Sequence, residues 1–387
     1  MIAGGPRAQP HVALHVSRRV APRPIDVRIV GGGFAGTVTA LTIMARVECN
    51  VTIYEREAAA HTTLCGEGLS DDTLRAFGAF DSSPYIAETY DEASWFFPGE
   101  KEFRIHQRGH TMARERWIPA MAEEVARRGG TYRTGAKVGE AAARAMAAEC
   151  DVLVGADGPG SIVRKLVGGA HETMLGIQYR VEREGRVPER LEFYTDKKYS
   201  PEYAWVFPRG DIMNVGLLAT GDGEDWARLD RFMKDKRVTG KVVKREAYPI
   251  GFFGDRVQKD NMVLVGDAAG LTNPITKGGM SAVVYAADVL ARSLAEGRLQ
   301  DYEARIHAHP ICDPSFGPAL AAIRRWSNAE FARVLRFAPD VIDVRPGRST
   351  ARAHPLRLGA SLAANPTRAR DMMHLAHAMG VSRQYSW

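Results

Sequence analysis

The chain has 387 residues, 45% hydrophobic and 25% charged, which is enough to bury a large core and to form two closely joined domains. Its net charge of +6 is concentrated at the ends: residues 1–25 and 344–387 together carry +10, which leaves −4 for the body. A basic body would indicate nucleic-acid binding, which this distribution excludes. Basic ends are more typical of solvated tails, with contact to an anionic membrane surface as the alternative.

The remaining composition indicates a cytoplasmic protein, with peripheral membrane contact through the basic ends as the alternative. Four scattered cysteines form no CxxC pair, which argues against structural zinc or a disulfide framework, and the histidines show no metal-ligand spacing. No apolar run approaches the length of a membrane-spanning helix. Residues 1–25 lack the apolar region of a secretory signal, and we expect them to form a disordered basic tail.

The first chemical motif lies in "IDVRIVGGGFAGTVTALTIMARVECNVTIYERE", which reads as strand, tight turn, helix and second strand. Gly31 permits the turn, Gly33 lets the backbone approach a pyrophosphate, and Gly36 lets the helix pack close to the sheet. Glu55 ends the second strand, Val51–Tyr54, where its carboxylate can accept hydrogen bonds from a ribose. This unit predicts a dinucleotide site but does not distinguish NAD from FAD.

Two later stretches favour FAD. A buried strand at Val152–Val154 runs into the sequence GADG, which contains Asp157 and Gly158. Another at Met262–Val265 runs into GDAAG, where Asp267 can bond a ribityl chain or, alternatively, simply cap a helix. The turn at 278–280 opens a helix whose positive end can face an electron-rich ring system.

In this order, GxGxxG with a distal acid, GADG and GDAAG resemble the FAD-binding proteins of the aromatic-hydroxylase fold. Within that group, "CGEGLS" at Cys65–Ser70 and "YAWVFPRG" at Tyr203–Gly210 resemble the geranylgeranyl reductase family over roughly residues 26–300. The resemblance implies an α/β (α+β) fold: a Rossmann-like FAD-binding domain with an inserted, mostly antiparallel β-sheet substrate domain and a helical C-terminal region. We assign residues 26–80, 114–170 and 255–300 to the FAD-binding domain. The substrate domain comprises residues 81–113 and 171–254, and the helical C-terminal region comprises residues 301–387.

The motifs and the resemblance together define the residues expected at the FAD. Arg114 joins them because "ARERWIPAMAEEVARRGG" resembles the segment whose arginine lies near the cofactor in those proteins. The full set is Gly31, Gly33, Phe34, Ala35, Gly36, Glu55, Arg56, Arg114, Asp157, Gly158, Gly266, Asp267, Pro274, Gly278, Gly279 and Met280.

The stretch "YAWVFPRG" predicts a strand with one aromatic face. Tyr203, Trp205 and Phe207 alternate, so all three would point to one face. The resemblance implies that this face covers a cavity above the flavin, where the three rings could line an apolar slot for a prenyl chain. Ordinary core packing is the alternative for each of them. We expect Pro208 to end the ladder pairing of this strand.

The "CGEG" loop supplies two further candidates for the catalytic site. Gly66 and Gly68 give the loop freedom to approach a flavin edge. Cys65 is a candidate wall or proton donor, with an inert buried thiol as the alternative, and Glu67 is a candidate acid.

The leading hypothesis is therefore an FAD-dependent oxidoreductase that reduces C=C bonds of a prenyl, lipid-like or natural-product substrate by hydride transfer from N5 of the reduced flavin. Its partners would be a small apolar substrate and an electron donor, either NAD(P)H or ferredoxin. The alternatives are an FAD-dependent monooxygenase of a small natural product, a halogenase, against which the lack of lysine before Lys101 counts, and a non-catalytic prenyl carrier.

Two features depart from the resemblance. Lys277 lies in the turn where a small residue is usual, and its cation would favour an anionic reduced flavin. The stretch "FGPALAAIRRWSNAEFARVLRFAP" predicts one amphipathic helix that packs on the body or caps the substrate tunnel.

Overall fold

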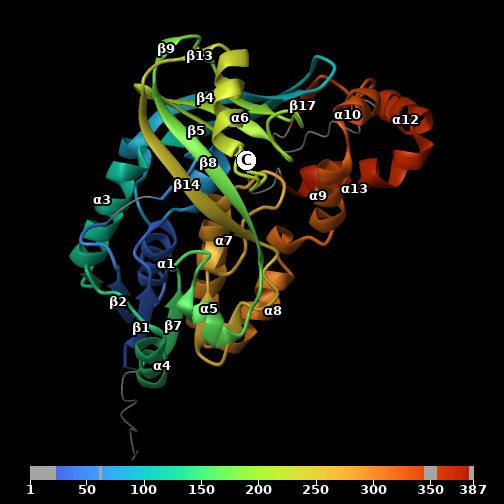
Figure 1. Ribbon diagram of the computed structural model, residues 1–387. Coiled ribbons are helices and arrows are strands. Elements are labelled where there is room, and N and C mark those ends of the chain that lie inside the picture. The colour runs from blue at the N-terminus through green and yellow to red at the C-terminus, as the bar shows by residue number, and fades with distance from the viewer. Residues whose placement is uncertain (1–22, 61–62, 344–354, 383–387) are drawn as a thin grey trace, which may run out of the picture.

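The computed structural model describes residues 23–60, 63–343 and 355–382 (Figure 1). It contains two large sheets, one above the other, with the last helices along one side. This arrangement confirms the predicted fold class of a Rossmann-like domain combined with a mostly antiparallel sheet.

The lower sheet is the dinucleotide-type sheet. Its four central pairings, from β16 through β7, β1 and β2 to β6, are parallel, and β15 adds an antiparallel edge. In spatial order its strands are β15 (Gln258–Lys259), β16 (Met262–Leu264), β7 (Val152–Gly155), β1 (Ile25–Val30), β2 (Cys49–Tyr54) and β6 (Thr131–Arg133).

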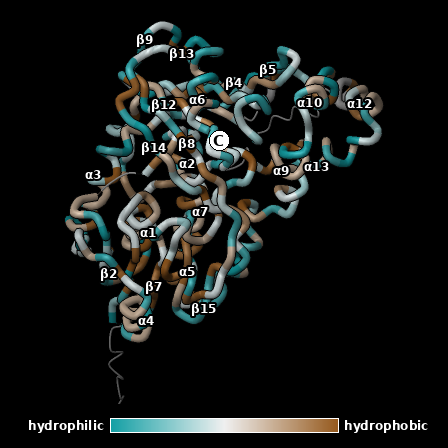
Figure 2. The backbone as a smooth tube through the Cα atoms, viewed as in Figure 1, coloured by the Kyte–Doolittle hydropathy of each residue, from teal (hydrophilic) through white to brown (hydrophobic). Residues whose placement is uncertain are grey.

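Helices cover this sheet because its strands are apolar on both faces. Figure 2 shows hydrophobic segments gathered at β7, α5 and α7, and the side chains of Val152–Val154 are buried. The helices that belong to this part are α1 (Phe34–Met44), α3 (Arg114–Arg127), α4 (Glu140–Glu149), α5 (Ile162–Val167), α7 (Gly279–Ala295) and α8 (Tyr302–His307).

The upper sheet is built from long, mostly antiparallel strands with apolar residues on both faces. One face packs toward the dinucleotide part, and the other is covered by α6 (Asp225–Asp235), whose Leu229 and Phe232 are buried in one cluster with Val206. Its strands, in spatial order, are β14 (Val242–Phe252), β8 (Glu172–Glu182), β12 (Ile212–Leu218), β11 (Ala204–Arg209), β10 (Leu191–Tyr194), β4 (Ile86–Phe97), β5 (Lys101–Met112) and β17 (Val341–Asp343), with β3 (Gly68–Ser70) also pairing with β5.

The C-terminal region packs beside the upper sheet (Figure 1) and contains a strand as well as helices, because β17 pairs in parallel with β5. The prediction of a single helix over "FGPALAAIRRWSNAEFARVLRFAP" is wrong. It divides into α9 (Phe316–Arg325) and α10 (Asn328–Val334), because Ser327 starts a new helix through a capping box with Glu330. The other helices of the described chain are α2 (Asp71–Ala76), α12 (Pro355–Ala364) and α13 (Ala369–Ser382).

The prediction that residues 1–25 form a disordered tail is wrong at the last of these residues. Ile25 begins β1, and Arg23 Nη2 lies 2.6 Å from Asp151 Oδ1. Residues 1–22 lie outside the described residues.

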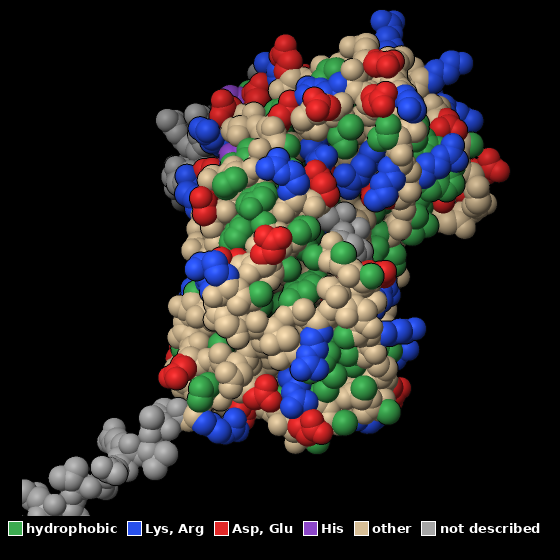
Figure 3. Space-filling view, turned by 90° about the vertical axis from the view of Figure 1, so that its left-hand side faces the viewer, with side chains coloured by type: hydrophobic (Ala, Val, Ile, Leu, Met, Phe, Trp, Pro, Cys, Tyr) green, Lys and Arg blue, Asp and Glu red, His purple; other side chains and the backbone are tan. Residues whose placement is uncertain are grey.

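Figure 3 shows exposed apolar side chains mainly across the middle of one face, at the height where the two sheets meet. No helix among the described residues is both long and apolar enough to cross a membrane.

Candidate functional site

A cavity of about 420 Å³ lies between the two sheets and joins the motifs that the sequence places far apart. Its lining begins at the turn after β1, passes the end of β2 and the turns after β7 and β16, and ends at the aromatic residues of β10 and β11. The predicted residues that line it are Gly31, Gly33, Phe34, Ala35, Glu55, Arg56, Cys65, Glu67, Arg114, Asp157, Gly158, Tyr203, Trp205, Phe207, Asp267, Gly278, Gly279 and Met280.

The glycines of the first turn have different surroundings. Gly31 has φ +102°, and a Cβ there would lie 2.4 Å from the carbonyl oxygen of Ala156. A Cβ at Gly36 would lie 1.9 Å from the carbonyl oxygen of Gly31, so this glycine lets α1 approach the turn. A Cβ at Gly33 would meet nothing within 4 Å. The space beside Gly33 is therefore open, as a pyrophosphate site at the N-terminus of α1 requires.

Glu55 lies at the end of β2, where the sequence predicts a ribose ligand. Its carboxylate is buried and accepts hydrogen bonds from the backbone N–H groups of Gly32 and Glu57, both at 2.8 Å. These bonds hold the side chain on the cavity wall beside the more exposed Arg56. Its contact with a ribose stays a prediction.

Two buried polar atoms on the cavity wall have no hydrogen-bond partner. Asp157 accepts a bond from the backbone N–H of Ile162 through Oδ2 at 2.7 Å, whereas its Oδ1 is unpaired. Arg114 donates to the carbonyl oxygen of Thr63 through Nη1 at 3.1 Å, whereas its Nε is unpaired. Burial raises the pKa of Asp157. Unpaired buried polar atoms are costly, so both atoms, together with the open space at Gly33, fit a polar ligand such as a flavin dinucleotide.

The turn after β16 is fixed by Asp267. Its Oδ1 accepts hydrogen bonds from the backbone N–H of Gly251 at 3.2 Å and the hydroxyl of Thr272 at 3.0 Å, so it ties this turn to β14 and does not cap a helix. Gly278 is the N-cap of α7, and the first turn of this helix faces the cavity. The expected cofactor residues that do not line the cavity are Gly36, Gly266 and Pro274.

The aromatic residues of the YAWVFPRG stretch share one face, as their alternation predicts. Tyr203, Trp205 and Phe207 line the cavity, while Ala204 and Val206 pack on the opposite face of the sheet. Tyr203 donates its hydroxyl hydrogen to the carbonyl oxygen of Thr276 at 2.6 Å, and Trp205 Nε1 donates to Oε1 of Gln178 at 3.0 Å. The aromatic wall therefore has a fixed orientation toward the turn that precedes α7.

The expectation that Pro208 ends the ladder is wrong. Pro208 pairs with Met213 and Arg209 with Ile212 before the chain turns at Gly210. The last residue of β11 that pairs with β10 is Val206, so the missing N–H of Pro208 faces a side where β10 has already ended. Its carbonyl oxygen accepts hydrogen bonds from the hydroxyls of Tyr90 and Thr111.

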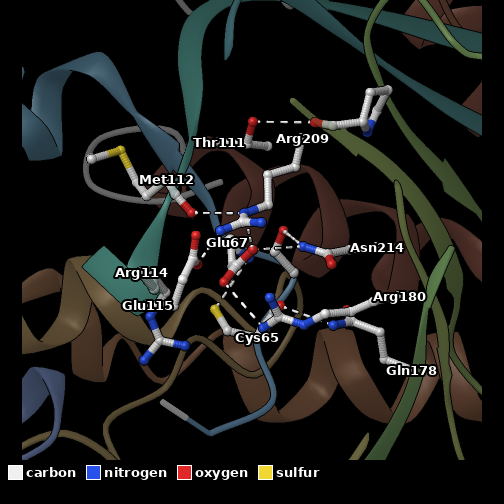
Figure 4. Close-up of polar contacts among 12 residues, drawn as sticks. Cys65, Glu67, Thr111, Met112, Arg114, Glu115, Gln178, Arg180, Arg209 and Asn214 are labelled. Atoms are coloured by element: carbon white, nitrogen blue, oxygen red, sulfur yellow. Dashed lines mark hydrogen bonds and ion pairs between the residues drawn. The ribbon is translucent and has the colours of Figure 1, made fainter. Parts of the chain in front are cut away.

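Glu67 lies at the centre of a buried ionic cluster (Figure 4). Its Oε2 is 2.6 Å from Arg209 Nε and accepts a hydrogen bond from Asn214 at 2.9 Å, and its Oε1 is 3.3 Å from Arg180 Nη2. Burial raises the pKa of Glu67, and the two guanidinium groups oppose that effect. These contacts indicate that Glu67 anchors the loop, in which its backbone has φ +66°. Its role as an acid stays a prediction.

Cys65 faces the cavity from the same loop. Its Sγ accepts a hydrogen bond from the backbone N–H of Glu67 at 3.2 Å, and burial raises the pKa of its thiol. The thiol is therefore protonated at neutral pH and can serve as an apolar wall or a proton donor. Both roles stay predictions.

Three buried polar residues around the CGEG loop were not predicted from the sequence. Gln178 and Arg180 alternate along β8, and both are buried together with Asn214 of β12. Gln178 Nε2 donates to the carbonyl oxygen of Cys65 at 3.2 Å, so it links the loop to Trp205. Polar residues at alternate positions of an otherwise apolar strand were the available signal.

Lys277 does not leave a free charge at the cavity. Its backbone has φ +55°, which explains why a small residue is expected there. Its Nζ lies 2.7 Å from Glu202 Oε2 and 4.4 Å from the ring centroid of Phe252, and Arg324 of α9 lies 2.9 Å from the other Glu202 oxygen. Burial lowers the pKa of Lys277, and Glu202 opposes this shift. The cluster connects the turn before α7 to the C-terminal helices.

Comparison with known proteins shows which proteins this chain resembles. No family model matches the chain. Two curated relatives are named digeranylgeranylglycerophospholipid reductase 2: that of Methanopyrus kandleri is 28% identical over 71% of this chain and 78% of its own, and that of Methanothermobacter thermautotrophicus 27% over 71% and 80%. Among solved structures, a geranylgeranyl bacteriochlorophyll reductase-like protein from Thermoplasma acidophilum has a TM-score of 0.75 with 18% identity, over 89% of this chain and 99% of its own. The flavin-dependent halogenase CmlS has a TM-score of 0.60 with 17% identity, over 92% and 78%.

The fold and the relatives define the class of protein as an FAD-dependent oxidoreductase. Within that class, the comparisons confirm the resemblance to the geranylgeranyl reductase family: the chain is similar to proteins that are named as reductases of this type.

Proposed function

We propose that the protein reduces C=C bonds of an apolar, prenyl-bearing substrate bound over FAD. One observation carries the proposal: a single cavity runs from the dinucleotide turn at Gly31 and Gly33 to the aromatic wall at Trp205 and Phe207. A ligand held at one end and an apolar substrate held at the other therefore meet in the same space. The relatives named as reductases of digeranylgeranyl lipids support an isoprenoid substrate.

The residues that would hold FAD are those whose surroundings fit the groups of this cofactor. Gly31, Gly33 and the N-terminus of α1 would bind the pyrophosphate, and Glu55 the ribose. The unpaired atoms of Arg114 and Asp157 would receive polar groups of the cofactor. When bound, FAD supplies a two-electron carrier, which an external reductant such as NAD(P)H or ferredoxin restores.

The chain's own contribution is to position the substrate and to exclude water. Trp205 and Phe207 present flat apolar surfaces, and the Cys65–Gly66 loop lies against them: a Cβ at Gly66 would lie 2.8 Å from the Phe207 ring. Reduction of a C=C bond also needs a proton at the second carbon. The protonated thiol of Cys65 or solvent is the source that we propose, since the carboxylate of Glu67 is engaged with two arginines.

The test is anaerobic reoxidation of the bound flavin. The FAD-loaded protein is reduced chemically, excess reductant is removed, and a prenyl alcohol is added without oxygen while flavin absorbance is followed. We expect reoxidation that depends on the alkene and is absent with the saturated alcohol. A flavin that reoxidises only when oxygen is admitted would favour an oxygenase and contradict the proposal.

A further inference from the structure

The apolar end of the cavity is closed by aromatic rings from three neighbouring strands. In the register of the upper sheet, Trp95 of β4 lies beside Phe193 of β10, which lies beside Trp205 of β11. Phe193, Trp205 and Tyr203 line the cavity, whereas Trp95 does not. On this side the cavity is therefore bounded by Phe193 and Tyr203, with Trp95 directly behind them.

The rings at this closed end pack tightly against one another. The Trp95 ring stacks on Phe193 with centroids 5.1 Å apart and meets Tyr203 edge-on at 5.6 Å. Behind it, Phe97 lies 5.7 Å from Trp95, and Phe331 of α10 lies 5.8 Å from Phe97. This continuous row leaves no path from the cavity toward the C-terminal helices, because its space is filled by packed rings.

Hydrogen bonds fix the same rings in place. Trp95 Nε1 donates to the hydroxyl of Thr195 at 2.9 Å, and Tyr203 is held by its bond to the carbonyl oxygen of Thr276. Both indole and phenol are buried. Rotation of either ring out of the way would break a buried hydrogen bond, so the closed end is a rigid stop and not a hinged one.

The volume of the cavity makes this stop important. About 420 Å³ has to accept both a dinucleotide head and the substrate, while cavities for a single drug-sized ligand span about 300–1,000 Å³. The space left for an apolar segment between the cofactor end and the aromatic stop is therefore limited. The rest of a long chain would have to remain outside the cavity.

We propose that Trp95, acting through Phe193 and Tyr203, sets how deeply a prenyl chain enters, so that the enzyme reduces only double bonds near the entering end and leaves the others unsaturated. This inference rests on the proposed function. It assigns as substrate a short prenyl group, or the end of a longer one, in place of a chain reduced along its whole length. Trp95 is a specificity-determining residue that contacts the cavity wall and not the substrate.

The test uses the FAD-loaded protein with an excess of chemical reductant, without oxygen, and geranylgeraniol, whose four double bonds report depth. After exhaustive reaction, mass and fragmentation give the number and positions of the saturated bonds. We expect wild type to saturate only bonds near one end and Trp95→Ala to saturate further bonds, with Trp95→Phe in between. The matched control is Phe96→Ala, because Phe96 stacks on Tyr194 on the opposite face of the sheet. Complete saturation by wild type, or equal patterns in Trp95→Ala and Phe96→Ala, would overturn the inference.

A binding series separates this inference from the proposed function. Saturated alcohols of increasing length are titrated against the oxidised holoprotein, with flavin absorbance as the signal. Each methylene buried strengthens binding about fourfold. We expect this gain to stop at a short chain length in wild type and to continue to longer chains in Trp95→Ala. If no alkene is reduced but this break in the series appears, the proposed function fails and the depth stop stands. If affinity in wild type rises with length without a break, the stop is refuted even if alkenes are reduced.

Discussion

Trp205→Ala is the substitution that separates a substrate wall from ordinary core packing. The indole is 5% exposed and donates to Gln178, which is fully buried. It also lies close over the backbone of Gly216, where an added Cβ would be 2.2 Å from its Cζ2 atom. One side of the ring borders the cavity and the other is packed, so both stability and function depend on it.

The magnitude follows from these contacts. A buried tryptophan truncated to alanine costs about 3–5 kcal/mol of unfolding free energy. The side facing the cavity lowers this value, while the acceptor left unpaired on Gln178 adds about 1–3 kcal/mol. We therefore expect a loss of about 3–4 kcal/mol, measured by urea unfolding of the holoprotein. We expect Trp205→Phe, which keeps a ring but not the N–H, to lose less.

The decisive comparison is between turnover and cofactor content. Trp205→Ala should retain bound FAD under conditions where it is folded, but reduce alkenes far more slowly than wild type. Trp226→Ala is the control, because Trp226 stacks on Tyr179 on the far face of the same sheet. Normal turnover in folded Trp205→Ala would remove the aromatic wall from the mechanism, and equal loss in both variants would make Trp205 a structural residue alone.

Three further expectations follow. Gly33→Val should fold, because its side chain meets open space, but should not bind FAD; full FAD content, measured by absorbance, would show that the pyrophosphate site is misplaced. Lys277→Met should cost about 1–3 kcal/mol in urea unfolding, because it leaves Oε2 of the buried Glu202 without its partner while Arg324 still pairs with the other oxygen; no loss would contradict a buried ion pair. Burial raises the pKa of both Cys150 and Cys312 to about 11 from the ordinary 9.0, so stability should fall as pH rises from 9 toward 11, and replacing both with alanine should remove this part of the slope.

Local patterns were enough to predict the dinucleotide half of the molecule. The glycines at 31, 33 and 36 indicate one backbone geometry, that of a dinucleotide-binding turn. The strand at Val152–Val154 is apolar on both faces, which indicates a buried strand. Alternation also placed Tyr203, Trp205 and Phe207 on one face, because a strand has a period of two. These three residues line the same cavity as Gly33 because of the way the two sheets pack. Only the family resemblance had suggested that arrangement.

Long-range contacts account for what the sequence did not show. Glu67 meets Arg180 and Arg209, which lie more than 100 positions away and are brought together by the order of the strands in the upper sheet. The pairing of β17 with β5 likewise follows from the way the C-terminal region returns to that sheet. No pattern in a single strand encodes either contact.

The central claim is that the enzyme adds hydrogen to a C=C bond, and the mass of the product tests it most directly. The holoprotein is incubated in air with an excess of chemical reductant and a prenyl alcohol that carries one double bond, and the product is analysed by mass spectrometry. We expect a product that has gained two hydrogen atoms per reduced bond and no oxygen. A product that has gained one oxygen atom, or a halogen atom when halide is present, would contradict the claim.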